Sequence, residues 1–246
     1  MGRMLNLPSG DKTLDCYLAE PTGETKGGLI LIHEVWGLVD HIKSVADRFG
    51  AEGYMVLAPD LLSETDIAAN VGTLNIDLFD PEKRSEAQPK LRALTAPMQV
   101  PEFGQKTIAK LKDCFDYLYN QAGLKQNVAV CGFCFGGSYS YSLAINEARL
   151  KAAVPFYGHV STEISELQKI NCPVLAFYGE KDENLMATLP ELKQNMKAAG
   201  VNYEAVVYPN VGHAFFNDTN KFTYNQAVAT DAWQRTLRFL AAHMNV

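Results

Sequence analysis

One stretch constrains the fold of this chain more than any other, the residues Val128-Ala-Val-Cys-Gly-Phe-Cys-Phe-Gly-Gly137. It opens with small or β-branched apolar residues, which are typical of a buried strand, and a helical pattern follows the glycine pair. The part from Gly132 to Gly136 matches the G-x-S-x-G nucleophile elbow, with cysteine in place of serine. In this motif a tight strand-to-helix turn raises the nucleophile, and glycines let backbone pass where a Cβ would clash. We therefore predict that Cys134 is a catalytic nucleophile, with its thiolate favoured by the start of the following helix.

Continuous apolar runs alternate with segments of helical periodicity along the chain. Besides the strand of the elbow, the runs predict strands at 13–19, 28–33, 54–58, 151–157, 173–178 and 203–208. The 13–19 strand alternates loosely and should lie half-exposed near the edge of the sheet. Helices are predicted at 41–52, 82–94, 108–119, 189–199 and 223–243, and after the elbow as far as about residue 146. This alternation predicts an α/β fold, a doubly wound and mostly parallel sheet with helices on both faces, in a single domain of residues 1–246.

Residues 61–101 interrupt the alternation. They begin at a strand end and carry several charges and prolines at positions 81, 89, 97 and 101. Long excursions of this kind often carry function. We expect this insert to act as a lid or to shape the substrate site.

In a parallel sheet ligands bind at the carboxyl ends of the strands, so the partners of Cys134 should follow other strands. Asp182 comes directly after the 173–178 strand, and His213 directly after the 203–208 strand. Nucleophile, acid and histidine in this order are expected of the α/β-hydrolase fold. We predict that His213 takes the thiol proton and later activates water, while Asp182 orients the imidazole. Glu180 and Glu183 are the alternative acids.

The α/β-hydrolase fold indicated by the order of Cys134, Asp182 and His213 also predicts which backbone N–H groups would bind an oxyanion. One N–H should come from Phe135, the residue after the nucleophile, and the other from the loop after the 28–33 strand. His33, His41, His159 and His243 are predicted to be packing, capping or solvent-facing residues.

Three other motifs suggest different chemistry. Cys131 and Cys134 form a C-x-x-C, which could be a thiol-redox pair, but Cys131 falls within the apolar strand. His33-Glu34 begins like the zinc motif H-E-x-x-H, yet position 37 is glycine. The glycine-rich turn lacks the Gly-Lys-Ser/Thr of a phosphate-binding loop, so no metal or cofactor is expected. A protein of this fold that only binds a ligand remains the other alternative.

Composition restricts the partners. The formal net charge of −6 argues against nucleic acid and anionic membrane surfaces as partners. No apolar run has the length of a membrane span, and the first residues lack a signal-peptide pattern. The five cysteines are scattered and odd in number, which fits reduced thiols in the cytoplasm. We expect a small-molecule substrate and favour a monomer.

These motifs together resemble the dienelactone hydrolase family, the carboxymethylenebutenolidase-like branch of the α/β-hydrolases. The resemblance covers nearly the whole chain. Besides the elbow, it rests on His33-Glu-Val-Trp-Gly37, Ala58-Pro-Asp-Leu61, Tyr178-Gly-Glu-Lys-Asp182 and Gly212-His-Ala-Phe-Phe216. It implies a cofactor-free hydrolase that cleaves a small carboxylic ester or lactone through a thioester on Cys134.

The resemblance also implies roles for two residues after the 28–33 strand. Glu34 would contact the resting cysteine and govern its protonation, and Val35 would supply the second oxyanion N–H. Members that cleave the lactone bind its carboxylate with arginines, one of them shortly after the catalytic histidine. This chain has Ala214-Phe-Phe-Asn-Asp218 there, without arginine. Arg84 and Arg92 in the insert are candidates for the other cation, so the substrate is left open.

Overall fold

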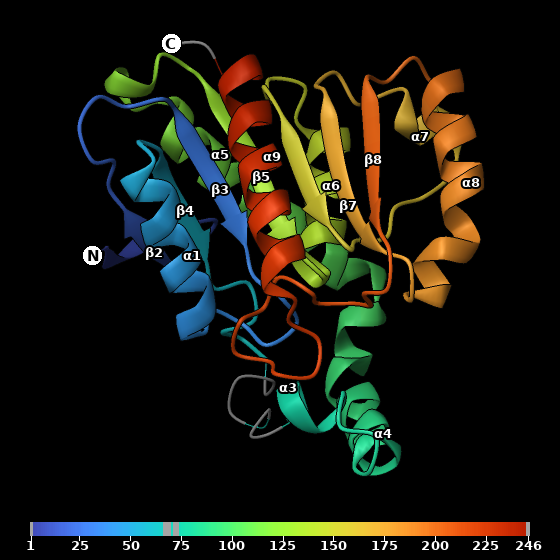
Figure 1. Ribbon diagram of the computed structural model, residues 1–246. Coiled ribbons are helices and arrows are strands. Elements are labelled where there is room, and N and C mark those ends of the chain that lie inside the picture. Colours follow the sequence, from blue (N-terminus) through green and yellow to red (C-terminus); the bar gives the residue numbers. More distant parts are fainter. Residues whose placement is uncertain (1, 66–69, 71–73, 245–246) are drawn as a thin grey trace.

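The computed structural model describes residues 2–65, 70 and 74–244. Within them the chain forms an eight-stranded sheet in the order β1-β2-β4-β3-β5-β6-β7-β8 (Figure 1). Neighbouring strands from β4 to β8 pair in parallel, and β2 pairs antiparallel with both β1 and β4. The strands are β1 Arg3–Ser9, β2 Lys12–Ala19, β3 Gly28–Ile32, β4 Met55–Pro59, β5 Val128–Phe133, β6 Ala153–Phe156, β7 Val174–Gly179 and β8 Tyr203–Tyr208. The predicted mostly parallel sheet is confirmed.

The central strands are apolar because both of their faces are covered. Every residue of β3, β5, β6 and β7 is buried, as expected for strands with helices on each side. Figure 1 shows α1 and α9 on one face of the sheet and α5 and α6 on the other. The helices are α1 Asp40–Ala51, α3 Leu74–Asp77, α4 Arg84–Thr95, α5 Pro101–Tyr119, α6 Phe135–Asn146, α7 Ile164–Leu167, α8 Glu183–Ala198 and α9 Gln226–His243, with 3₁₀ turns at Ala96–Gln99 and Ala122–Leu124.

The amino-terminal edge of the sheet differs from the prediction. β1 was not predicted, and it takes the edge position, pairing with β2 from Arg3↔Leu18 to Ser9↔Lys12. The 13–19 strand therefore lies inside the sheet, and its last four residues are buried. The strand lies near the edge, as predicted, but it is more buried than the predicted half-exposed strand because β1 covers its outer side.

Two helices begin earlier than the apolar spacing predicts. α5 begins at Pro101, a favourable first position for proline, and not at Ile108. α8 begins at Glu183 and not at Leu189. The added turns are largely exposed, so apolar periodicity does not mark them. The early start of α8 makes Asp182 the residue that immediately precedes the helix.

The insert after β4 extends from the end of the sheet where the parallel strands terminate (Figure 1). It carries α3 and α4 and packs through a small apolar cluster of Trp36, Leu74 and Ala87. Trp36 belongs to the loop after β3, so this cluster joins the insert to the loop that follows Glu34. Of the predicted 61–101 insert, residues 66–69 and 71–73 lie outside the described part of the chain. None of the described helices combines the length and the apolar character that a membrane crossing requires.

Candidate active site

The elbow forms the strained turn that its glycines predicted. Cys134 has φ 56° and ψ −110°, a backbone conformation that residues with a Cβ rarely adopt. Its N–H donates to the carbonyl of Phe156 at 3.0 Å, which ties the turn to β6. A Cβ on Gly132 would collide with the carbonyl of Gly136, and one on Gly136 with the carbonyl of Ile32. Only glycine at these two positions lets α6 start close enough to β3 and β5 to present Cys134 at the strand ends.

His213 and Asp182 meet at the same edge of the sheet. His213 lies in the loop after β8, and its Nδ1 is 2.5 Å from Oδ2 of Asp182, to which it donates. The His213 side chain is 29% exposed and that of Asp182 10%, so the pair is shielded but open to a ligand. Glu180 instead accepts the N–H of Asn210, and Glu183 is exposed in α8. Of the three acids considered, Asp182 is the one that holds the imidazole.

The electrostatics of His213 couple it to the cysteine. Burial alone would lower the pKa of the imidazole, but the Cys134 sulfur and the Asp182 carboxylate outweigh it and raise that pKa to about 10. The Cys134 charge is the largest of the raising effects. The arrangement therefore stabilises the protonated imidazole of His213.

Glu34 is buried at the same edge, in the loop after β3. Its carboxylate accepts a hydrogen bond from Nδ2 of Asn217 at 2.6 Å and a longer one, 3.4 Å, from the hydroxyl of Tyr157. Burial raises the pKa of Glu34, and His41, Asn217, His213 and Tyr157 oppose that rise. The Tyr157 ring also packs against the His213 imidazole, with centroids 4.8 Å apart. Glu34 is thus part of the same polar group as the histidine, and its described hydrogen bonds go to Tyr157 and Asn217.

The two expected oxyanion donors lie on adjoining segments. Val35 follows Glu34 in the loop after β3, and Phe135 is the first residue of α6. The carbonyl of His33 accepts the N–H of Gly136 at 3.0 Å, which joins that loop to the start of α6. In the described part of the chain neither the Val35 nor the Phe135 N–H donates to a turn or loop carbonyl.

His33 is a structural residue, as predicted. Its Nδ1 donates to the carbonyl of Glu34 at 2.6 Å, and its Nε2 accepts the N–H of Leu61 at 3.1 Å. The ring therefore joins the loops after β3 and β4 and holds the backbone on which Glu34 and Val35 sit.

Sequence reasoning missed Tyr157, Asn217 and the position of His159. Tyr157 directly follows β6, Asn217 lies four residues after His213, and His159 lines the same cleft as His213 and Asp182. Their positions after predicted strands could have indicated that they lie near the site, but no sequence motif distinguishes them from other loop residues.

A cleft of about 800 Å³ opens beside the histidine and Asp182. Helix α4 forms one wall, on which Arg84, Gln88 and Arg92 follow each other at helical spacing. The lining also includes Phe222 and Tyr224, both partly exposed, from the loop after His213. Among the described residues neither arginine forms an ion pair. Lys181 also lines the cleft and forms no ion pair among the described residues, so the cleft combines three available cations with two aromatic side chains.

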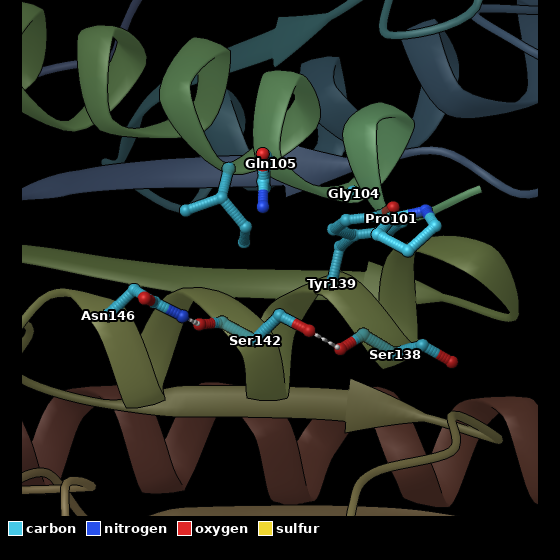
Figure 2. A pocket seen from close by; sticks show the side chains of 8 residues that line it. Pro101, Gly104, Gln105, Ser138, Tyr139, Ser142 and Asn146 are labelled. Atoms are coloured by element: carbon cyan, nitrogen blue, oxygen red, sulfur yellow. Dashed lines mark hydrogen bonds between the residues drawn. The ribbon is translucent and has the colours of Figure 1, made fainter. Parts of the chain in front are cut away.

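A second cavity, of about 600 Å³, lies between α5 and α6 (Figure 2). Figure 2 shows Ser138, Ser142 and Asn146 in a row along α6, with Gln105 of α5 opposite. Asn146 Nδ2 donates to the Ser142 carbonyl at 2.8 Å, and Ser142 Oγ to the Ser138 carbonyl at 3.2 Å. The described residues that line it do not include His213 or Asp182. The cleft beside α4 includes His213 and Asp182 in its lining but not Cys134, so it is the candidate substrate-binding part of the active site.

Cys131 lies fully buried in β5, and burial raises the pKa of its thiol. A redox cysteine needs an accessible thiolate, so the geometry gives no support to a Cys131–Cys134 couple. Among the described residues no three His, Cys, Asp or Glu side chains gather as metal ligands would.

A mostly parallel sheet, with an elbow after β5 and an acid and a histidine after β7 and β8, defines an α/β hydrolase. The dienelactone hydrolase family model matches residues 14–244. A Saccharolobus solfataricus protein named "Putative carboxymethylenebutenolidase" is 34% identical over 244 residues, covering 91% of this chain and 92% of its own. The chain belongs to the dienelactone hydrolase family and is a hydrolase of the carboxylic-ester type.

Solved structures agree with this fold. The structure titled "Putative Dienelactone Hydrolase" from Klebsiella pneumoniae has a TM-score of 0.81 and 26% identity, covering 98% of both chains. A dienelactone hydrolase-like promiscuous phosphotriesterase, P91, from metagenomic libraries has a TM-score of 0.78 and 20% identity, covering 99% of this chain and 98% of its own. At that identity the second likeness concerns the fold alone.

Proposed function

We propose that this chain hydrolyses a carboxylic ester or lactone through a thioester formed on Cys134, with His213 and Asp182 completing a triad. The observation that carries the proposal is the state of His213. One of its nitrogens donates to Asp182 at 2.5 Å, and the Cys134 sulfur and that carboxylate together raise the imidazole pKa to about 10. A histidine poised in this way favours the thiolate, which is the nucleophilic form of cysteine.

The reaction divides into two halves. The Cys134 thiolate attacks the carbonyl, and the N–H groups of Val35 and Phe135 hold the oxyanion. As the intermediate collapses, the protonated His213 gives its proton to the leaving oxygen. Formation of the thioester removes the sulfur charge, which is the largest effect that raises the His213 pKa. The imidazole pKa therefore falls, and neutral His213 serves as the base that activates water for hydrolysis.

Glu34 governs the resting state of the nucleophile in this proposal. It is only 1% exposed and belongs to the same polar group as His213. A buried carboxylate beside the site favours positive charge on the histidine and opposes negative charge on the sulfur. Its protonation therefore influences how much thiolate is present before substrate arrives.

The cleft supports a substrate that carries a negative charge. Arg84, Arg92 and Lys181 line the cleft without ion-pair partners among the described residues. Phe222 and Tyr224 add apolar surface to the same lining. We propose that the 61–101 insert shapes the substrate site through these arginines, in place of an arginine after His213. The similar proteins named carboxymethylenebutenolidase fit an anionic ester or lactone as the substrate class. The free cysteines support action in the cytoplasm, and we favour a monomer.

Replacing Arg92 or Arg84 with alanine should raise KM for an anionic aryl ester on the order of tenfold. A charge-assisted hydrogen bond contributes about 1.5–3 kcal/mol, and the neutral ester of the same alcohol does not form it. The measurement is kcat and KM for both esters with each variant. Lys90→Ala is the matched control, since Lys90 is exposed on the same helix but does not line the cleft. Equal effects on the two esters would show that these arginines do not recognise charge.

The thioester can be observed directly. Mixing the protein with excess 4-nitrophenyl acetate and quenching in acid after a few milliseconds should add one acetyl group to the peptide that contains Cys134. The adduct should be lost on treatment with neutral hydroxylamine, which cleaves thioesters. Peptide mass spectrometry makes the measurement. Steady turnover with no adduct at Cys134 would contradict the covalent mechanism.

A further inference from the structure

The cleft beside α4 carries more positive charge than one carboxylate of a substrate can neutralise. Besides Arg84, Arg92 and Lys181, the described lining contains two acids, Asp182 and Glu183. Asp182 is engaged with the catalytic histidine, so three unpaired cations stand against one acid. The described lining therefore has an excess of two positive charges, although the whole chain has a formal net charge of −6. A cleft of one sign of charge attracts ligands of the opposite sign.

The histidines of the lining do not change this excess. When His213 is protonated, its charge is balanced by the carboxylate of Asp182, to which its Nδ1 donates at 2.5 Å. Burial lowers the pKa of His159, so its imidazole is neutral at pH 7. A ligand that neutralises the described lining therefore carries two negative charges.

Lys181 belongs to the loops that carry the catalytic pair. Its N–H donates to the carbonyl of Val211 at 2.9 Å, and the neighbouring Glu180 accepts the N–H of Asn210 at 3.0 Å. These bonds join the turn after β7 to the turn that leads into His213. The Lys181 side chain itself is exposed and forms none of the described side-chain hydrogen bonds. Lys181 thus offers a free ammonium group on a backbone that is fixed relative to His213.

The two arginines belong to a different part of the chain. They stand eight residues apart on α4, which places their Cα atoms about 12 Å apart along the helix axis. α4 is held through the cluster of Trp36, Leu74 and Ala87, and not through the turn that holds Lys181. A guanidinium binds a carboxylate through two parallel hydrogen bonds, whereas an ammonium group acts as a point charge. The cations therefore provide two different kinds of anion contact on two separately held segments.

We propose that the substrate is an ester or lactone with two anionic groups, one bound by Lys181 beside the catalytic pair and the other by the arginines of α4. The inference rests on the proposed function, in which an anionic ester reacts at Cys134. The cleft of about 800 Å³ lies within the range that proteins use for ligands of drug size, so it has room for both groups. A substrate with one carboxylate would leave Lys181 or the arginines without an ionic partner.

Four nitrophenyl esters test the proposal, because they carry a carboxylate on neither side, on either side or on both sides of the same ester bond. They are 4-nitrophenyl hexanoate, mono-4-nitrophenyl adipate, and the hexanoate and the adipate of 5-hydroxy-2-nitrobenzoic acid. We expect each added carboxylate to raise kcat/KM about tenfold, so that the doubly charged ester is the best substrate. Release of the nitrophenol makes the measurement, and the increase should shrink in high salt.

Variants assign the two carboxylates to their cations. Lys181→Ala should remove the advantage of one carboxylate, and Arg92→Ala that of the other, about tenfold in kcat/KM in each case. Neither should change the rate with the neutral hexanoate of 4-nitrophenol. Lys181→Arg keeps the charge and should keep the preference for the doubly charged ester. The matched control is Lys193→Ala, which removes an exposed cation of α8 outside the lining and should affect none of the four esters.

The inference is overturned if the doubly charged ester reacts no better than the better of the singly charged esters. It is also overturned if Lys181→Ala lowers kcat/KM equally for all four esters, since displacement of the catalytic loops then explains the loss. Acyl-enzyme formed from the neutral hexanoate tests the proposed function separately. A hexanoyl group on Cys134 without any preference for charge refutes the second anionic group alone, whereas turnover without this adduct refutes the thioester mechanism.

Discussion

Replacing Cys134 with alanine should lower kcat for an activated ester by on the order of 10⁴-fold or more. Loss of a triad nucleophile removes the covalent route entirely, and only binding and oxyanion stabilisation remain. The fold should persist, because Cys134 is half-buried and its positive φ costs alanine no more than cysteine. Steady-state kinetics and thermal unfolding of the same preparation measure both effects.

Cys131→Ala is the matched control, since it removes the other sulfur of the C-x-x-C without touching the cleft. It should retain most of the ester turnover. Full activity in Cys134→Ala would refute the nucleophile, whereas equal loss of activity in both variants would favour a dithiol couple of Cys131 and Cys134.

Replacing Asp182 with asparagine should lower kcat/KM by about 10²–10⁴-fold with little change in stability. The amide keeps the shape of the carboxylate but removes a charge that raises the His213 pKa. Protonated His213 is present below its pKa and disappears as pH rises through about 10, so the wild-type alkaline decline in activity should lie near that value. In Asp182→Asn the pKa falls, and the decline should move to lower pH. The pH profile of kcat/KM makes the measurement.

Little loss of stability is expected because the Asp182 side chain makes no capping hydrogen bond to α8, although the residue stands at its N-terminus. Glu191→Gln, exposed on the same helix and outside the cleft lining, is the control and should change neither the rate nor the pH profile. Full activity in Asp182→Asn would show that another group orients His213.

The strands and the candidate triad could be predicted because the sequence patterns that indicate them extend over only a few neighbouring residues. Continuous apolar runs indicate β3, β5 and β7, since a strand covered on both faces has no polar side. The glycines at 132 and 136 mark the turn, because a Cβ at either place meets a backbone carbonyl. Helix starts were less predictable: the first turns of α5 and α8 face solvent, and their burial pattern contains no periodicity to detect.

Contacts between loops could not be predicted in the same way. Tyr157 and Asn217 come from different strand ends and meet only at the carboxylate of Glu34. His41 was expected to be an ordinary packing or surface residue, yet it joins α1 to Asp218 across a separation of 177 residues. None of these side chains belongs to a motif that would indicate its contacts from the neighbouring sequence.

The sequence by itself determined the sheet, the elbow at Cys134 and the order in which an acid and a histidine follow later strands. These features follow from apolar periodicity and from the steric demands of a tight turn, which act over a few neighbouring residues. Only the tertiary structure decided that His213 pairs with Asp182, that Arg84 and Arg92 face the cleft, and that Glu34 lies among two histidines, a tyrosine and an asparagine. Such juxtapositions depend on how loops pack after the strands end, and therefore on contacts between residues far apart in the chain.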